Sequence, residues 1–98
     1  MKNFDVYIRE NSWIAKLAAR KLKAGSMAIV IGSTIHLYNT TKENFISNEK
    51  WLNHELCHVQ QYRRLGFLNF IFKYLLESIR NGYHNNRFER EARLAENS

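Results

Sequence analysis

The sequence predicts an α+β fold, a mostly helical domain in which a small antiparallel β-hairpin packs against a central helix. The chain has 98 residues, no proline and four glycines, a composition that favours long helices joined by short turns. Apolar residues recur at helical spacing through most of the chain, whereas residues 27–38 contain two runs rich in β-branched residues. With 45% apolar residues, a chain of this length can bury one modest core, so residues 1–98 are expected to form a single domain.

The first expected helix covers residues 12–23, "SWIAKLAARKLK", and separates its large apolar residues from its basic residues on a helical wheel. Asn11 or Ser12 can cap its start, and Gly25 can end it.

The expected hairpin consists of "MAIVI", a strand at residues 27–31, and the first part of "TIHLYN", a strand at residues 34–38. Gly32 and Ser33 between them fit a two-residue turn. The segment from Thr40 to Phe45 is expected to be a loop.

Three further helices are expected after the hairpin. The first is a long helix from Ser47, its N-cap, to Leu65, with Gly66 just past its end. The second covers residues 67–80 and is stopped by the turn sequence Asn81-Gly82, and the third covers residues 86–97.

The composition favours a cytoplasmic protein. The single cysteine, Cys57, excludes an internal disulfide and suits a reducing compartment. The N-terminal sequence lacks the apolar segment of a signal peptide, and the most apolar stretch, residues 65–79, is too short and too polar to cross a bilayer.

The net charge of +6 permits an acidic partner but does not establish one. Basic residues occur in every segment, which favours a solvated basic surface over a nucleic-acid site. The basic helix over residues 12–23, with Trp13, leaves a module that binds nucleic acid or an anionic membrane as a weaker alternative.

The stretch "LNHELCHVQQ", residues 52–61, carries the pattern H-E-x-x-H inside an expected helix. His54 and His58 lie one turn apart on one face, so both imidazoles can approach one metal ion. Zinc binds imidazole nitrogen and keeps an open position in catalytic sites, and Glu55 can serve there as general base. The alternative is two partly buried histidines that bond to neighbouring residues, with Glu55 in a surface salt bridge.

A catalytic zinc site of this type needs a third protein ligand, and the segment "NRFEREARLAE" offers Glu89, Glu91 and Glu96. Spacing alone does not choose between Glu89 and Glu91, which flank the same apolar stripe. Ala92, one turn from Glu89, allows a close approach of the two helices and mildly favours Glu89. The alternative is a solvated helix face.

The motifs "HELCHVQQYRRLG" and "NRFEREA" resemble those of gluzincin zinc metallopeptidases, and more closely those of minimal single-domain bacterial metallopeptidases. The resemblance covers roughly residues 27–96 and implies a minimal zincin-like fold. It implies a hydrolase that cleaves peptide or protein substrates with a zinc cofactor. It also implies that His54, His58 and Glu89 are the metal ligands and that Glu55 is the catalytic base. A zinc-binding module that has lost catalysis is the alternative function.

The chain departs from the family pattern at Arg93, where many gluzincins have an aspartate that orients a ligand histidine. The orienting group must then come from elsewhere in the chain. Gln61 matches a family glutamine and is either such an outer-shell group or an ordinary polar position.

The remaining candidates are weaker. In zincins an edge strand binds the substrate backbone, and "TIHLYN" is the expected edge here. His36 on that strand can line the cleft or be structural, and Tyr83 or His84 can stabilise an oxyanion. Cys57 is expected to be a passive small residue. The sequence does not determine the oligomeric state or the cleavage preference.

Overall fold

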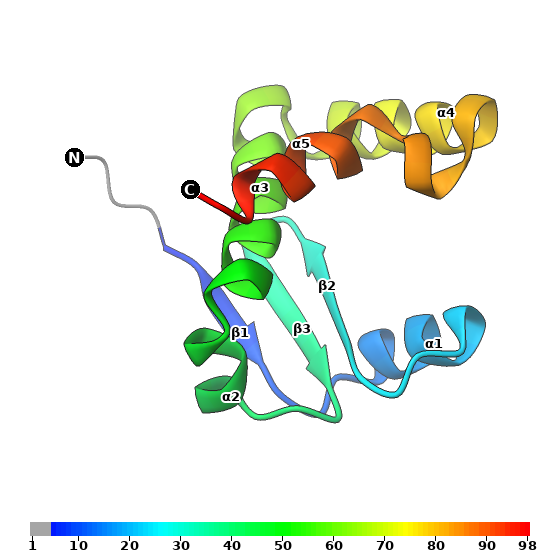
Figure 1. Cartoon of the computed structure of the whole chain (residues 1–98). Coiled ribbons are helices and arrows are strands. Elements are labelled where there is room, and N and C mark those ends of the chain that lie inside the picture. Colours follow the sequence, from blue (N-terminus) through cyan, green and yellow to red (C-terminus); the bar gives the residue numbers. More distant parts are fainter. Residues whose placement is uncertain (1–4) are drawn as a thin grey trace.

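The sheet contains three strands in a computed structural model that describes residues 5–98 (Figure 1). β2 (Met27–Ile31) and β3 (Thr34–Tyr38) form the predicted antiparallel hairpin with the predicted bounds, and β1 (Tyr7–Arg9) pairs in parallel with β3. The α+β class is confirmed, but the sheet is mixed because of β1. Three residues are too few to show the alternation that reveals a strand in a sequence.

The strand order β1-β3-β2 places β3 in the centre of the sheet. The prediction that "TIHLYN" is the substrate-binding edge is therefore wrong, because β3 is paired on both sides. β2 has only one strand neighbour among the described residues, so its outer edge is the one that faces the cleft described below.

α1 (Trp13–Leu22) confirms the first predicted helix. The Ser12 side chain caps it by accepting a hydrogen bond from the Ala15 amide, as the sequence suggested. Its end comes at Lys23 in the left-handed conformation, with φ 57°, and not at Gly25. Ser12 Oγ also lies 2.8 Å from His36 Nδ1, so His36 connects the sheet to the start of α1.

The predicted loop over residues 40–45 is wrong, because α2 (Lys42–Ser47) occupies most of it. The Thr41 side chain accepts from the Asn44 amide, and Phe45 anchors this short helix in the core. Six residues are too few to give a readable helical period. The start of α3 (Glu49–Leu65) is consequently capped by Asn48, one residue after the predicted Ser47.

α4 (Phe67–Asn85) begins as predicted and is interrupted at Gly82, where φ 80° and ψ 163° are not helical. The predicted stop at Asn81-Gly82 thus marks a break, after which one short turn follows. α5 (Arg87–Ala95) starts at the Asn86 cap. Asn86 is buried and also donates to the Tyr74 carbonyl and Ser78 Oγ, so it fixes α5 against α4.

The core lies where α3 packs against the sheet and against α4 and α5 (Figure 1). Its buried members come from β2, β3 and the helices α2 to α5: Val30, Ile35, Leu37, Phe45, Val59, Tyr62, Phe70 and Phe88. α3 therefore contacts most of the other elements, and a side chain on α3 can face the sheet edge and α5 at once.

No helix within residues 5–98 is long and apolar enough to span a membrane. The cytoplasmic location expected from the sequence stays a prediction.

Candidate metal centre

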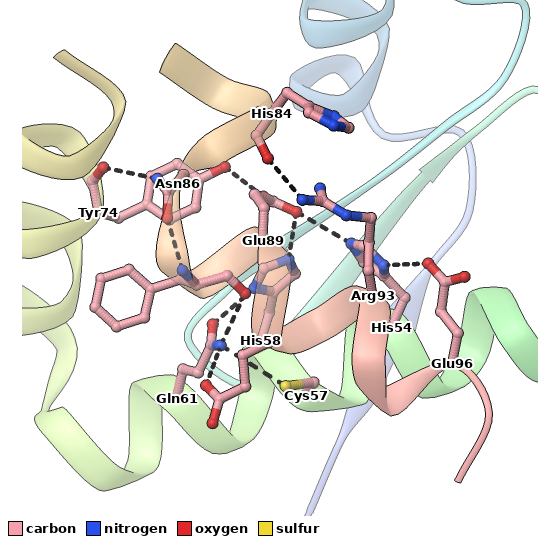
Figure 2. A network of polar contacts seen from close by, with 12 residues as sticks. His54, Cys57, His58, Gln61, Tyr74, His84, Asn86, Glu89, Arg93 and Glu96 are labelled. Carbon is pink, nitrogen blue, oxygen red and sulfur yellow. Dashed lines mark hydrogen bonds and ion pairs between the residues drawn. The ribbon is translucent and has the colours of Figure 1, made fainter. Parts of the chain in front are cut away.

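The two histidines of α3 converge on one carboxylate of α5 (Figure 2). Glu89 Oε1 lies 3.1 Å from His54 Nε2 and 3.2 Å from His58 Nε2. One ligand atom from each of these three residues lies within 4.8 Å of the others. His54, His58 and Glu89 are therefore close enough to hold one metal ion.

The helix contact that brings Glu89 to the histidines depends on Ala92, which is fully buried. A side chain without bulk at this position lets α5 approach α3 closely. Glu91 points elsewhere, since its Oε1 accepts from Gln61 Nε2 at 2.7 Å and pairs with Arg64 at 3.2 Å. Of the two acids between which spacing left the choice open, Glu89 and not Glu91 thus lies with the two histidines.

Gln61 fixes the orientation of the His58 ring. Its Nε2 donates to the Phe88 carbonyl at 3.1 Å and to Glu91, so its Oε1 is left to face His58 Nδ1 at 2.8 Å. An amide oxygen only accepts, so Nδ1 carries a proton, and when the ring is neutral the Nε2 lone pair is directed at the site. Gln61 is fully buried, so the outer-shell role suggested by the sequence fits and the ordinary-position alternative does not.

Glu96 performs the same task for His54. Its Oε2 lies 2.8 Å from His54 Nδ1, and a carboxylate at this distance accepts a hydrogen bond from Nδ1–H, so in the neutral ring the lone pair is on Nε2 (Figure 2). Arg93, at the family's aspartate position, donates instead to the His84 carbonyl at 2.6 Å. The carboxylate that the sequence lacks at position 93 is therefore supplied three residues later.

Tyr74 is a site residue that sequence analysis missed. Its hydroxyl donates to Glu89 Oε2, the oxygen that does not face the histidines. The residue fits the apolar helical pattern of α4, and its ring packs against Phe70 and Phe88, so its spacing signals only core packing. Its hydroxyl leaves Glu89 Oε1 as the oxygen available to a metal.

The polar contacts shift the pKa values of the three candidate ligands. Burial raises the pKa of Glu89, but hydrogen bonds from His54, His58 and Tyr74 outweigh it and hold the pKa well below its usual range. Burial lowers the pKa of His54, but hydrogen bonds to Glu89 and Glu96 outweigh it and raise the pKa to about 9. Without a metal, a proton on the histidines balances the negative charge of Glu89, and a bound metal ion would provide positive charge in its place.

Glu55 lies beside the three candidate ligands and is 7% exposed. Burial raises its pKa to about 7, against the opposing effect of His58 and His54. A carboxyl group with this pKa exchanges its proton near neutral pH, which suits a general base.

A cleft of about 380 Å³ opens onto the candidate ligands and Glu55. Its walls come from α1 and α4, which extend from the sheet beyond β2 (Figure 1). All five residues of β2 line it. Because successive strand residues point to opposite faces, this lining means that the cleft runs along the free edge of β2.

The weaker candidate residues differ in whether they line the cleft. Tyr83 lines the cleft, whereas His84 and His36 do not, and His84 uses its backbone carbonyl to hold Arg93. Cys57 is buried on another side of α3, and burial raises the pKa of its thiol to about 11. It is not one of the clustered ligands, in agreement with the passive role that the sequence suggested.

A family model, the eCIS core domain, matches residues 4–66, well over half of the chain. The chain belongs to the eCIS core domain family. The domain that defines this family is a domain of extracellular contractile injection systems. The match to the eCIS core domain includes the helix with His54, Glu55 and His58, and it ends before α4 and α5, which provide Tyr74 and Glu89. No curated protein and no solved structure matches the chain.

Proposed function

We propose that this eCIS core domain is a small zinc-dependent metallopeptidase that hydrolyses peptide bonds, as its likeness to the gluzincins implies. The observation that carries the proposal is the convergence of His54 Nε2, His58 Nε2 and Glu89 Oε1 beside a buried acid, Glu55, at the base of a cleft. Two imidazoles and one carboxylate form the ligand set of many catalytic zinc sites.

The residues around the ligands fit zinc. Gln61 and Glu96 each accept a hydrogen bond from the Nδ1–H of one histidine, which leaves both Nε2 lone pairs for the metal. When bound, zinc supplies a Lewis acid that polarises a carbonyl and lowers the pKa of water to near 7. His54, His58 and Glu89 provide three protein ligands, so one position is left for the reactants, as in catalytic zinc sites.

Glu55 is assigned as general base. It is on the same helix as the two histidines and lines the same cleft. In the proposed reaction its carboxylate takes the proton of the attacking water and then gives it to the leaving amine. Tyr83, which lines the same cleft, is assigned as the donor of a hydrogen bond to the developing oxyanion.

The free edge of β2 is assigned to the substrate backbone, in place of the edge of β3 that the sequence suggested. In a hairpin with a two-residue turn, the pair next to the turn, Ile31 and Thr34, bonds across the strands, and so do alternate pairs. The amides of Ala28 and Val30 therefore point outward. The Val30 carbonyl accepts from the Tyr62 hydroxyl at 3.2 Å, which leaves the Ala28 groups for a substrate strand.

The family supports a protein substrate. A domain of a multi-protein injection system has protein neighbours, and a peptidase within it would act on one of them. The same family membership supports the second candidate function, a zinc-binding module that holds a partner without cleaving it.

The test is to measure zinc in protein purified without chelator and to assay it against a peptide library. We expect one zinc per chain and cleavage of some peptides. Glu55→Gln should keep zinc and lose at least 100-fold in hydrolysis, since general base catalysis contributes about 10²–10⁴-fold. Glu49→Gln, an exposed acid in the first turn of the same helix, is the matched control. Absence of zinc would refute the proposal, and zinc without cleavage would select the binding module.

A further inference from the structure

Two hollows of different chemistry meet at the candidate metal centre. We call the cleft between α1 and α4 the apolar arm; residues that line only this arm include Ala18, Leu22, Ile71 and Leu75. The second hollow, of about 570 Å³, is the polar arm; residues that line only it include Ser26, Asn48, Lys50 and Glu96.

The residues shared by the two arms show where the centre lies. His54 and Glu55 line both hollows, together with Met27, Ala28 and Tyr83. The candidate ligand, the candidate base and the start of β2 therefore separate the apolar arm from the polar arm. A polypeptide that runs past this point places neighbouring side chains in different arms.

The rim of the apolar arm carries large apolar side chains that are exposed to solvent. Leu22 on α1 is 58% exposed and Leu75 on α4 is 55% exposed, and both line the hollow. A bulky apolar side chain that entered between them would remove both from water, which is favourable in proportion to the apolar area covered.

Ala18 is the small residue of the α1 wall. It lies one turn before Leu22 on the same side of the helix, and it lines the apolar arm where a larger side chain would occupy the space. A volume of about 380 Å³ is enough for a side chain as large as phenylalanine.

The polar arm has the opposite character. Lys50, Asn48 and Glu96 line it, and Glu96 is also bonded to His54. A polar side chain can replace its water contacts with hydrogen bonds to these groups, whereas an apolar side chain would cover them without compensation.

We propose that the site selects polypeptide segments with a bulky apolar side chain on one side of the reacting peptide bond and a polar side chain on the other. Ala18 and Leu75 are the residues that determine the apolar preference. The inference rests on the proposed function, because the junction of the arms is taken as the place of reaction. The inference concerns which side chains the substrate carries and does not depend on how the substrate backbone pairs with β2.

The first measurement is a map of cleavage sites in a peptide library treated with the zinc-loaded protein, read by mass spectrometry. We expect Leu, Ile, Met or Phe at one position next to the cleaved bond, at least 10-fold over Ala, and polar residues at the position across it. Ala18→Phe should remove this preference by filling the apolar arm, while Leu17→Phe, an exposed neighbour on α1 outside the arm, should not.

Two further variants test the apolar preference without the risk of misfolding and without a need for catalytic turnover. Leu75→Asp alters an exposed rim residue, so it should preserve the fold and also reduce the apolar preference. Zinc-loaded Glu55→Gln, which binds without cleaving, is used to select peptides from a phage-displayed library. If the selected peptides are enriched in bulky apolar residues, and Leu75→Asp reduces this enrichment, the role of the apolar arm is supported. Failure of the parent protein to cleave any peptide would then refute only the proposed function. Cleavage or selection without side-chain preference would overturn the inference.

Discussion

His54 Nδ1 and Glu96 Oε2 lie 2.8 Å apart, which joins the candidate metal centre to the last turn of α5. Asn53, the residue before His54, strengthens this link by donating to the Glu96 carbonyl at 3.4 Å. Glu96 reaches this ring nitrogen from about one turn beyond Arg93, the position at which the sequence lacked an orienting carboxylate.

We predict that Glu96→Gln lowers zinc affinity by about 10- to 100-fold, the usual effect of losing an outer-shell partner of a metal-binding histidine. The carboxylate makes the His54 ring a better ligand and fixes the proton on Nδ1; a neutral amide does this less well. Competition with a chromophoric chelator measures the affinity.

Glu43→Gln, an exposed acid in the first turn of α2, is the control for the loss of one negative charge. Equal zinc affinity in the Glu96 and Glu43 variants would show that Glu96 does not position His54.

Gln61→Met should destabilise the metal-free protein by about 1–3 kcal/mol, the cost of leaving buried polar groups without partners. The substitution keeps the bulk of the side chain but removes the acceptor for His58 Nδ1 and the donor to the Phe88 carbonyl. Urea unfolding followed by circular dichroism measures the change, and zinc affinity should fall with it because the His58 ring is no longer held.

Gln60→Met provides the comparison, because Gln60 is the exposed neighbour of the same residue type on the same helix. A loss of stability as large in this variant would mean that the hydrogen bonds of Gln61 contribute little.

The sequence revealed the parts of the site that depend on one helix, and it revealed less where several elements meet. His54, His58 and Glu55 follow a spacing that one helix determines, so their common direction was predictable. The preference for Glu89 followed from the small size of Ala92, and the contact of α3 with α5 confirms that Glu89 joins the cluster. The role of Tyr74 could not be predicted, because its helical spacing is the same whether its hydroxyl faces solvent or donates to a carboxylate.

The errors in the fold have the same origin. β1 is three residues long and α2 is six, and both are stabilised by tertiary contacts, β1 by pairing with β3 and α2 by the burial of Phe45. Without β1 the hairpin appeared to have its free edge at β3. The edge next to the site could be assigned to β2 only after the strand order was known.

The stability of the metal-free protein should fall as pH rises from about 6.5 to about 9. The pKa of His54 is raised from its usual 6.5 to about 9 in the folded state, where hydrogen bonds to Glu89 and Glu96 outweigh burial. A raised folded-state pKa gives stability that is fully present below pH 6.5 and is lost as pH passes through about 9. We expect a loss of roughly 1–3 kcal/mol across this range, because each pKa unit corresponds to about 1.4 kcal/mol.

Glu55 and Glu89 change protonation mainly below pH 7.5. The raised pKa of Glu55, about 7, lowers stability progressively as pH rises from 4.5 to 7, and the lowered pKa of Glu89 gives stability that is lost only in acid. Unfolding in urea at pH 7.5 and 9, with chelator present, therefore isolates the histidines. His54→Asn should flatten the profile above pH 7, whereas His84→Asn, at an exposed position away from the cluster, should leave it unchanged.

With zinc bound, the fall in stability above pH 6.5 should disappear, because the metal-bound and the unfolded histidines both lack a second proton there. A metal ion takes the place of the protons on the histidines, so zinc binding must displace them and becomes stronger as pH rises. The zinc-loaded protein should thus gain stability relative to the metal-free protein between pH 6 and pH 8. A zinc-induced gain that did not depend on pH would mean that the ion binds somewhere other than at His54 and His58.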